Sequence, residues 1–273
     1  MKKLLLAILA AFALLATSCD CFFLPGEGYI YSESGAVIVG GDNKPIRLIN
    51  NENAANPTFE QLLIFISEDD TNTLPYVKDG PEVFVCSDFA ETLHNNAEQA
   101  GIKAGWVSID YADGSIGHAI NAFETTDMGL VFIDCTGGLL KTWDGEQYIY
   151  ESAIDPYPAA DKWDTIGYLA IGKIYGHIGI DEAESLEYSF LEDYLNGWES
   201  YKTLLAEYNH QVKQYNEAVE GKTFITGTEE YQQMKAWQTE LKEMEKTLSE
   251  MEDELGDYYY LPSGIVSSYS IYW

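Results

Sequence analysis

The chain has 273 residues, and its 45 acidic side chains against 15 basic ones give a net charge of −30 at pH 7. This charge excludes nucleic acid as an expected partner, because the phosphate backbone would repel the protein. The length is enough for one sizeable core, or for one core with an appended element.

Residues 1–18 have the plan of a signal peptide: two lysines, an apolar run too short to cross a membrane, and small residues before Cys19. The end of this segment resembles the cleavage box of bacterial lipoproteins. We therefore expect lipid attachment at Cys19 and a protein held at the outer face of the cytoplasmic membrane or at the cell surface, in contact with the membrane through the anchor only. Ala16 stands where such boxes usually have leucine, so free secretion is the alternative.

Residues 19–55 are expected to form a tether that leads into a β-hairpin, since two β-type runs flank the turn-forming segment 40–43. Residues 56–183 follow as the candidate catalytic domain. Its first helix is predicted to open at Asn56-Pro57-Thr58 and to run through Ser67, because apolar residues recur there at helical spacing.

The segment from Val83 to Thr136 carries the densest pattern. A helix is predicted over residues 86–100, with Gly101 as its stop. Strands are predicted over residues 103–110, 117–124 and 130–134, with a weaker strand signal at 168–171. A helix followed by an antiparallel meander indicates an α+β fold.

Residues 184–256 show apolar side chains at alternating steps of three and four, which is a heptad repeat, interrupted by Gly221 and Gly227. This pattern predicts an antiparallel coiled-coil hairpin that serves as a spacer or as an arm for self-association. Residues 257–273 are aromatic and β-prone, and we expect this tail to return to the core as a strand.

Cysteine chemistry is suggested by Cys86, which starts a predicted helix. The positive end of a helix and its free N–H groups stabilise a thiolate. No cysteine pair has metal-ligand spacing with a nearby histidine, so that neither a metal nor another cofactor is expected. Cys135 directly follows Asp134 on a predicted strand and should point to the opposite face.

A thiolate needs an imidazole as its proton partner, and four histidines compete for this role. His94 lies too far along the same helix, and His210 is expected to be solvated on the hairpin. His177, in a glycine-rich segment, is the second choice. His118 is the strongest candidate, because it starts a strand and Asp134 ends the next one, where antiparallel pairing brings the two together.

Four sequence blocks resemble the transglutaminase-like superfamily: Val85-Cys86-Ser87-Asp88-Phe89-Ala90, Ala100-Gly101-Ile102-Lys103-Ala104, Gly117-His118-Ala119-Ile120-Asn121-Ala122 and Val131-Phe132-Ile133-Asp134-Cys135-Thr136. The resemblance covers about residues 56–140. Lys103 and Ala104 stand where the family commonly has an arginine, and Cys135 replaces a frequent proline.

This resemblance implies a papain-like fold and acyl transfer from an amide through a thioester on Cys86. His118 would act as base and then acid, and Asp134 would orient the ring. Water as acceptor gives a peptidase or amidase, which is favoured for small exported members, whereas an amine acceptor gives a cross-linking transglutaminase. The expected substrate is a surface or cell-wall peptide or protein. The backbone N–H of Cys86 supplies one oxyanion donor, and Gln61 and Trp106 are the candidates for the second.

Two non-enzymatic interpretations remain. In the first interpretation, the chain is a surface binding module that uses its acidic face or the hairpin to hold a partner. In the other it is a structural lipoprotein whose hairpin is the functional part, which predicts tolerance of any change at Cys86.

Overall fold

The computed structural model describes residues 27–136, 140–150, 164–256 and 264–273. The predicted signal peptide and the predicted lipid attachment site Cys19 lie outside these residues. No helix of the described ranges is long and apolar enough to cross a membrane.

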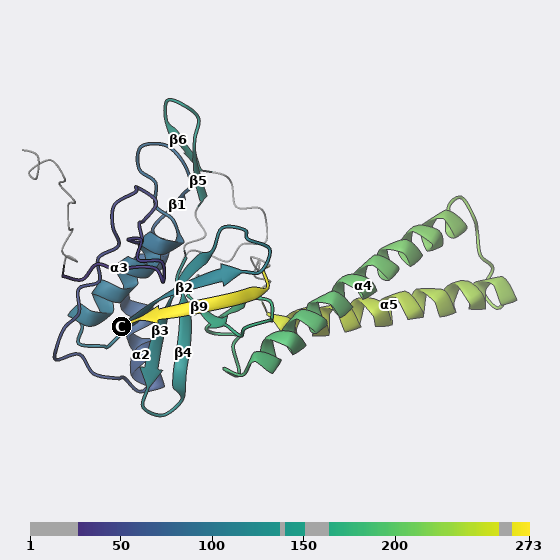
Figure 1. Cartoon of the computed structure of the whole chain (residues 1–273). Coiled ribbons are helices and arrows are strands. Elements are labelled where there is room, and N and C mark those ends of the chain that lie inside the picture. The colour runs from purple at the N-terminus through teal and green to yellow at the C-terminus, as the bar shows by residue number, and fades with distance from the viewer. Residues whose placement is uncertain (1–26, 137–139, 151–163, 257–263) are drawn as a thin grey trace, which may run out of the picture.

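The fold is α+β, as predicted, and its centre is a six-stranded antiparallel sheet (Figure 1). The strand order is β8-β7-β4-β3-β2-β9. The strands are β2 (Gly105–Tyr111), β3 (His118–Thr125), β4 (Gly129–Asp134), β7 (Thr165–Tyr168), β8 (Gly176–Gly179) and β9 (Val266–Tyr272). β9 pairs with β2, so the predicted return of the C-terminal tail to the core is confirmed.

Helices α2 (Phe59–Glu68) and α3 (Cys86–Gln99) share one core with the sheet. Thr58 caps α2 by accepting the N–H of Gln61, and Gly101, with φ 82°, ends α3 as predicted. The buried face of α3 includes Phe89, Leu93 and Ala97, which pack with Phe123, Val131 and Ile133 of the sheet. This packing fixes α3, and with it Cys86, relative to β3 and β4.

The N-terminal part of the described chain lies along α3. Only isolated antiparallel bridges form where a hairpin was predicted, at Tyr29–Arg47, Tyr31–Val37 and Val39–Pro45. Backbone N–H groups of this segment donate to α3 side chains, from Arg47 to Glu91, from Ile49 to Asn95 and from Asn51 to Glu98. The segment also has backbone bonds of its own across the predicted turn, from Gly40 N–H to the carbonyl oxygen of Lys44 and from Ile46 N–H to that of Ile38. It is therefore held both by these bonds and by α3.

A second, three-stranded sheet was not predicted. Its strands are β1 (Tyr76–Val77), β5 (Leu140–Trp143) and β6 (Tyr148–Tyr150), and the short helix η1 (Thr71–Thr73) precedes them. β1 runs parallel to β5, and an antiparallel bridge joins Val77 to Phe84 just before α3. Tyr76 is thereby held near the first turn of α3.

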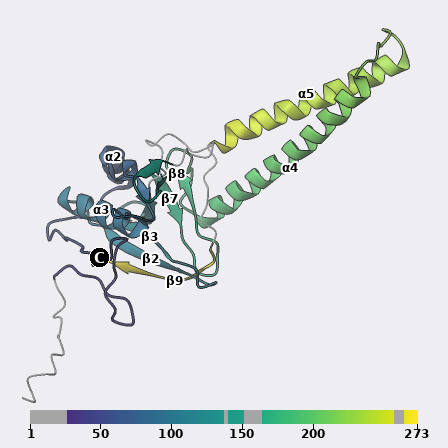
Figure 2. The ribbon, with the colours of Figure 1, turned by 90° about the horizontal axis from the view of Figure 1, so that it is seen from above.

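Two long helices, α4 (Tyr188–Val219) and α5 (Glu229–Leu255), form a pair that projects away from the sheet (Figures 1 and 2). The connection contains Gly221 and Gly227, as predicted, and both glycines have positive φ. Leu191, Tyr194 and Trp198 at the base of α4 belong to the same core as α3 and the sheet. Coiled-coil packing along the whole pair and self-association remain predictions.

Candidate functional site

Cys86 is the first residue of α3, with a half-buried and unpaired thiol. Asp88, two residues later, accepts the N–H of Val85 at 2.8 Å and the N–H of Gly41 at 2.9 Å. These bonds hold the first turn of the helix in place. The sulfur therefore lies at the positive end of a fixed helix dipole.

Gly40 and Gly41 explain why the N-terminal segment approaches this turn so closely. A Cβ atom on Gly41 would lie 2.7 Å from Cγ1 of Val83, and one on Gly40 would overlap the Asp88 carboxylate. Only glycine fits at both positions. This loop thus supports the helix end that carries Cys86.

His118 and Asp134 meet in the structure, as the strand pattern predicted. Nε2 of His118 lies 2.7 Å from Oδ2 of Asp134. Because Asn121 pairs with Ile133 across β3 and β4, His118 and Asp134 are diagonal neighbours near the same end of the two strands. The contact leaves Nδ1 of His118 as the ring nitrogen for Cys86.

The Cys86 side chain interacts with the imidazole of His118, so the structure brings all three predicted residues together. Burial opposes the charged form of His118, but the charges of Asp134 and Cys86 and the hydrogen bonds to both together outweigh it, and they raise the pKa of His118 well above its ordinary value of 6.5. Burial also opposes ionisation of Asp134, yet the imidazolium holds the pKa of that carboxyl well below its usual range. The His118–Asp134 pair is therefore charged at neutral pH.

Tyr175 is a member of this group that the sequence did not reveal. Its hydroxyl donates to Oδ2 of Asp134 at 2.7 Å, and its ring centroid lies 5.3 Å from that of His118. The backbone N–H of Thr136 donates to the other oxygen of Asp134 at 3.0 Å. Nothing in a chain with 20 tyrosines marks Tyr175, apart from its place beside His177 in the glycine-rich segment.

The remaining histidines take the places that the sequence suggested. His94 is buried with Nε2 3.0 Å from Oδ1 of Asn50, and burial lowers its pKa to about 4. His210 is exposed on α4. His177 stacks on Tyr175 at 6.2 Å between centroids, and its charge is among those that lower the pKa of Asp134.

Cys135 points into the core, away from Asp134, as predicted. Burial raises the pKa of its thiol well above the ordinary value. Its sulfur lies 4.0 Å from the carbonyl oxygen of Phe89. A buried neutral thiol of this kind is a poor nucleophile.

Both predicted candidates for the second oxyanion donor have other hydrogen-bond partners in the structure. The N–H of Thr58 donates to the Gln61 side chain at 2.9 Å at the start of α2. This part of α2 lies beside the β3–β4 turn, whereas His118 is at the other end of β3. The indole N–H of Trp106 donates to the carbonyl oxygen of Ser87 at 3.2 Å. The prediction for Gln61 was wrong because its amide completes a helix-capping box.

Tyr76 has its hydroxyl beside Cys86 and is a third candidate for the second donor. It interacts with the backbone of Cys86, and its ring stacks on Phe89 with centroids 6.2 Å apart. Burial, with the nearby charge of Cys86, raises the pKa of Tyr76 to about 12, so its hydroxyl keeps its proton. Its two-residue strand gave no recognisable pattern in the sequence.

No protein-family model, curated protein or solved structure matches this chain. Across the described ranges, no group of three or more His, Cys, Asp or Glu side chains could hold a metal ion.

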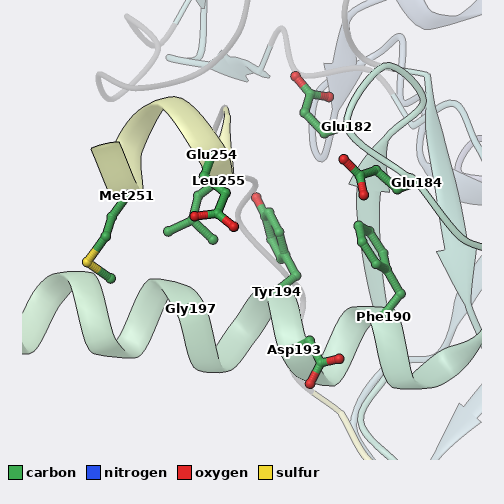
Figure 3. A pocket seen from close by; sticks show the side chains of 9 residues that line it. All are labelled: Glu182, Glu184, Phe190, Asp193, Tyr194, Gly197, Met251, Glu254 and Leu255. Carbon is green, nitrogen blue, oxygen red and sulfur yellow. The ribbon is translucent and has the colours of Figure 1, made fainter. Parts of the chain in front are cut away.

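A cavity of about 290 Å³ lies apart from this group, at the base of the helix pair (Figure 3). Apolar side chains from both helices and four carboxylates surround it. The lining residues are Glu182, Glu184, Phe190, Asp193, Tyr194, Gly197, Met251, Glu254 and Leu255. The cavity can accept a small group that is both apolar and cationic.

Proposed function

We propose that this protein is a cysteine-dependent hydrolase or acyltransferase of the transglutaminase-like type, acting on amide bonds of surface or cell-wall peptides. The observation that carries the proposal is the meeting of three element ends. Cys86 begins α3, His118 begins β3 and Asp134 ends β4, and the three side chains interact in that order. A thiol at a helix start, an imidazole and an orienting carboxylate are the parts that thioester chemistry needs.

In the acylation step, the Cys86 sulfur attacks the carbonyl carbon of the amide. A C–S bond forms, and the π electron pair of the carbonyl moves to its oxygen. We assign stabilisation of this oxyanion to the backbone N–H of Cys86 and to the Tyr76 hydroxyl, which interacts with the Cys86 backbone. When the intermediate collapses, the C–N bond breaks and the leaving amine takes a proton from His118.

In the second step, water or an amine attacks the thioester. His118, now neutral, accepts the proton of the attacking group, and the C–S bond breaks to release the Cys86 sulfur with the proton returned to the pair. Water gives a carboxylic acid, and an amine gives a new amide. Asp134 remains ionised throughout and orients the ring.

The proposal also includes the arrangement of the catalytic core and the location of the protein. We place the catalytic core in a papain-like arrangement and the whole protein outside the cell, anchored by a lipid on Cys19. The net charge of −30 favours encounter with cationic peptides or amine acceptors.

The test is alkylation of the mature chain by iodoacetamide at pH 6, with mass-spectrometric location of the label. We expect Cys86 to react, and its rate to fall by at least about tenfold in His118→Ala. His210→Ala is the matched control, because His210 is exposed on α4 and far along the chain from the site. Equal rates in wild type and His118→Ala would overturn the proposal.

A second candidate function, binding of a cationic partner, is favoured by the cavity at the base of the helix pair. Its carboxylates complement a lysine-rich peptide, and its apolar wall complements the methylene chain of lysine. Titration calorimetry with such a peptide should show binding that the double variant Glu184→Gln and Asp193→Asn weakens. The control is Glu207→Gln with Glu240→Gln, which removes the same charge from exposed positions of α4 and α5. Equal affinities for both double variants would exclude this cavity as the binding site.

A further inference from the structure

The Asp134 carboxylate accepts more hydrogen bonds than its contact with His118 accounts for. Oδ2 lies 2.7 Å from Nε2 of His118 and also 2.7 Å from the hydroxyl of Tyr175, which donates to it. The second oxygen accepts the backbone N–H of Thr136 at 3.0 Å. One oxygen is thus shared between the imidazole and a phenol.

The position of Tyr175 is tightly determined. The side chain is fully buried, and its backbone N–H donates to the carbonyl oxygen of Gly264 at 2.9 Å. A Cβ atom on Gly167 would lie 3.4 Å from the Tyr175 hydroxyl, which shows how closely β7 approaches. The ring packs in a cluster with Val107, Ile109, Ile120, Ala122 and Val266. A buried phenol in such a cluster costs free energy unless its hydroxyl is bonded, and Asp134 supplies the acceptor.

We infer that Tyr175 is a positioning residue of the proposed active site, which fixes the Asp134 carboxylate and shares the negative charge of Oδ2 with His118. The inference rests on the proposed function and deepens it. Burial raises the pKa of Tyr175 well above its ordinary value, so the phenol acts only as a donor. Its effect should be largest in the second chemical step, in which His118 must be neutral to accept a proton.

The reason lies in how the charges around His118 change during the reaction. In the thioester, Cys86 carries no negative charge, so Asp134 becomes the main group that holds the proton on the imidazole. Without the phenol, the charge on Oδ2 acts on His118 alone and holds that proton more strongly. Other titratable groups also face the pair, namely Cys86 from α3, His177 from β8, Tyr111 from β2 and Tyr76 from β1, and all stay unchanged in the comparison below.

The test compares Tyr175→Phe with Tyr168→Phe. Tyr168 is also buried, and its hydroxyl donates to the carbonyl oxygen of Ser185 at 2.7 Å, so its variant loses a similar bond away from Asp134. Each mature chain is acetylated with p-nitrophenyl acetate, and loss of the acetyl group from Cys86 is followed by intact mass across pH. Thermal unfolding of both variants shows that they are folded.

We expect the pH midpoint of deacetylation to rise by about one unit in Tyr175→Phe, with a rate about tenfold lower below that midpoint. Tyr168→Phe should match wild type, and iodoacetamide should label Cys86 in Tyr175→Phe at least as fast as in wild type. If wild type and Tyr175→Phe show the same pH profile of deacetylation, Tyr175 only contributes to packing and the inference is overturned. If wild-type Cys86 is not acetylated, or alkylates independently of His118, the proposed function itself fails.

Discussion

At the scale of residues, the charges of Asp134 and Cys86 together keep the His118 imidazole protonated at neutral pH. Burial opposes both charged forms, but the imidazolium and the donors around the carboxylate lower the pKa of Asp134, and the charges of Asp134 and Cys86 raise the pKa of His118. Each partner thus stabilises the ionised form of the other. Cys86 contacts His118, which in turn contacts Asp134. Removal of the charge of Asp134 should therefore alter the reactivity of Cys86.

Asp134→Asn keeps the shape of the side chain and removes its charge, so we expect alkylation of Cys86 at pH 6 to fall by about tenfold or more. The control is Asp164→Asn, because Asp164 is a half-buried carboxyl whose pKa is raised to about 7 by burial and by Asp69. At pH 6 Asp164 is largely uncharged, and its replacement should leave the rate unchanged. Similar losses in both variants would indicate a general effect on folding.

Tyr76→Phe tests the oxyanion donor. Attack on an ester creates an oxyanion, whereas alkylation by iodoacetamide does not, so the two reactions separate stabilisation of the intermediate from reactivity of the thiol. We expect acetylation by p-nitrophenyl acetate to slow by about tenfold to a hundredfold in Tyr76→Phe and alkylation to stay at the wild-type rate. A parallel fall in both rates would show that Tyr76 acts on the thiol or on the packing of α3.

The residues predicted from sequence are those that begin or end regular elements close together in the chain. His118 and Asp134 are 16 residues apart on neighbouring strands, so an antiparallel turn is enough to bring them together. Tyr175 reaches Asp134 across 41 residues and an intervening strand, and no local pattern marks that contact. Gln61 was predicted as an oxyanion donor, but its side chain accepts the N–H of Thr58 in the capping box of α2.

At the scale of elements, the first turn of α3 depends on a loop from a distant part of the sequence. The helices and the meander carried clear periodic patterns, and the structure reproduces them with shifts of a few residues at the ends. The small sheet had no such signal, because β1 has two residues and pairs in parallel with a strand more than sixty positions later. The hydrogen bond from the N–H of Gly41 to Asp88 could not be predicted from the sequence either.

Asp88→Ala should destabilise this turn, because it removes the Oδ2 atom that accepts the N–H groups of both Val85 and Gly41. We expect a loss of about 1–2 kcal/mol in the free energy of unfolding, measured by urea denaturation. Glu245→Gln, at an exposed position within α5, removes the same charge and should change the stability by less than about 0.5 kcal/mol. A variant of Asp88 as stable as that control would show that the two bonds contribute nothing net.

At the scale of the whole molecule, one core joins the sheet, α3 and the root of the helix pair. Leu191 of α4 is fully buried in the cluster that contains Phe89 and Ile133, and a Cβ atom on Gly176 of β8 would lie 2.8 Å from its side chain. The heptad pattern predicted the two helices, but it could not indicate where they join the sheet. A change that destabilises this core should consequently also disturb the site, because α3 and the sheet carry Cys86, His118 and Asp134.

The pH dependence of that stability follows from several buried groups with opposite signs. His118, with a raised pKa, contributes stability that is present below pH 6.5 and lost as the pH rises through its folded-state pKa. Asp134, with a lowered pKa, contributes above pH 3.8 and loses its contribution as the pH falls through its folded-state pKa. Asp164, whose pKa is raised to about 7, favours the folded state as the pH falls from 7 to 3.8.

His94 acts in the same acidic range with the opposite sign to Asp164, and a variant separates the two. Burial lowers the pKa of His94 to about 4, so between pH 6.5 and 4 the unfolded chain binds a proton that the folded chain does not. This difference should remove up to about 3 kcal/mol of stability at pH 4 relative to pH 7. In His94→Gln, which can still donate to Asn50, urea denaturation should show a smaller loss over the same range than in wild type. Parallel pH profiles for the two proteins would mean that the imidazole is protonated in the fold, and would contradict its burial as a neutral group.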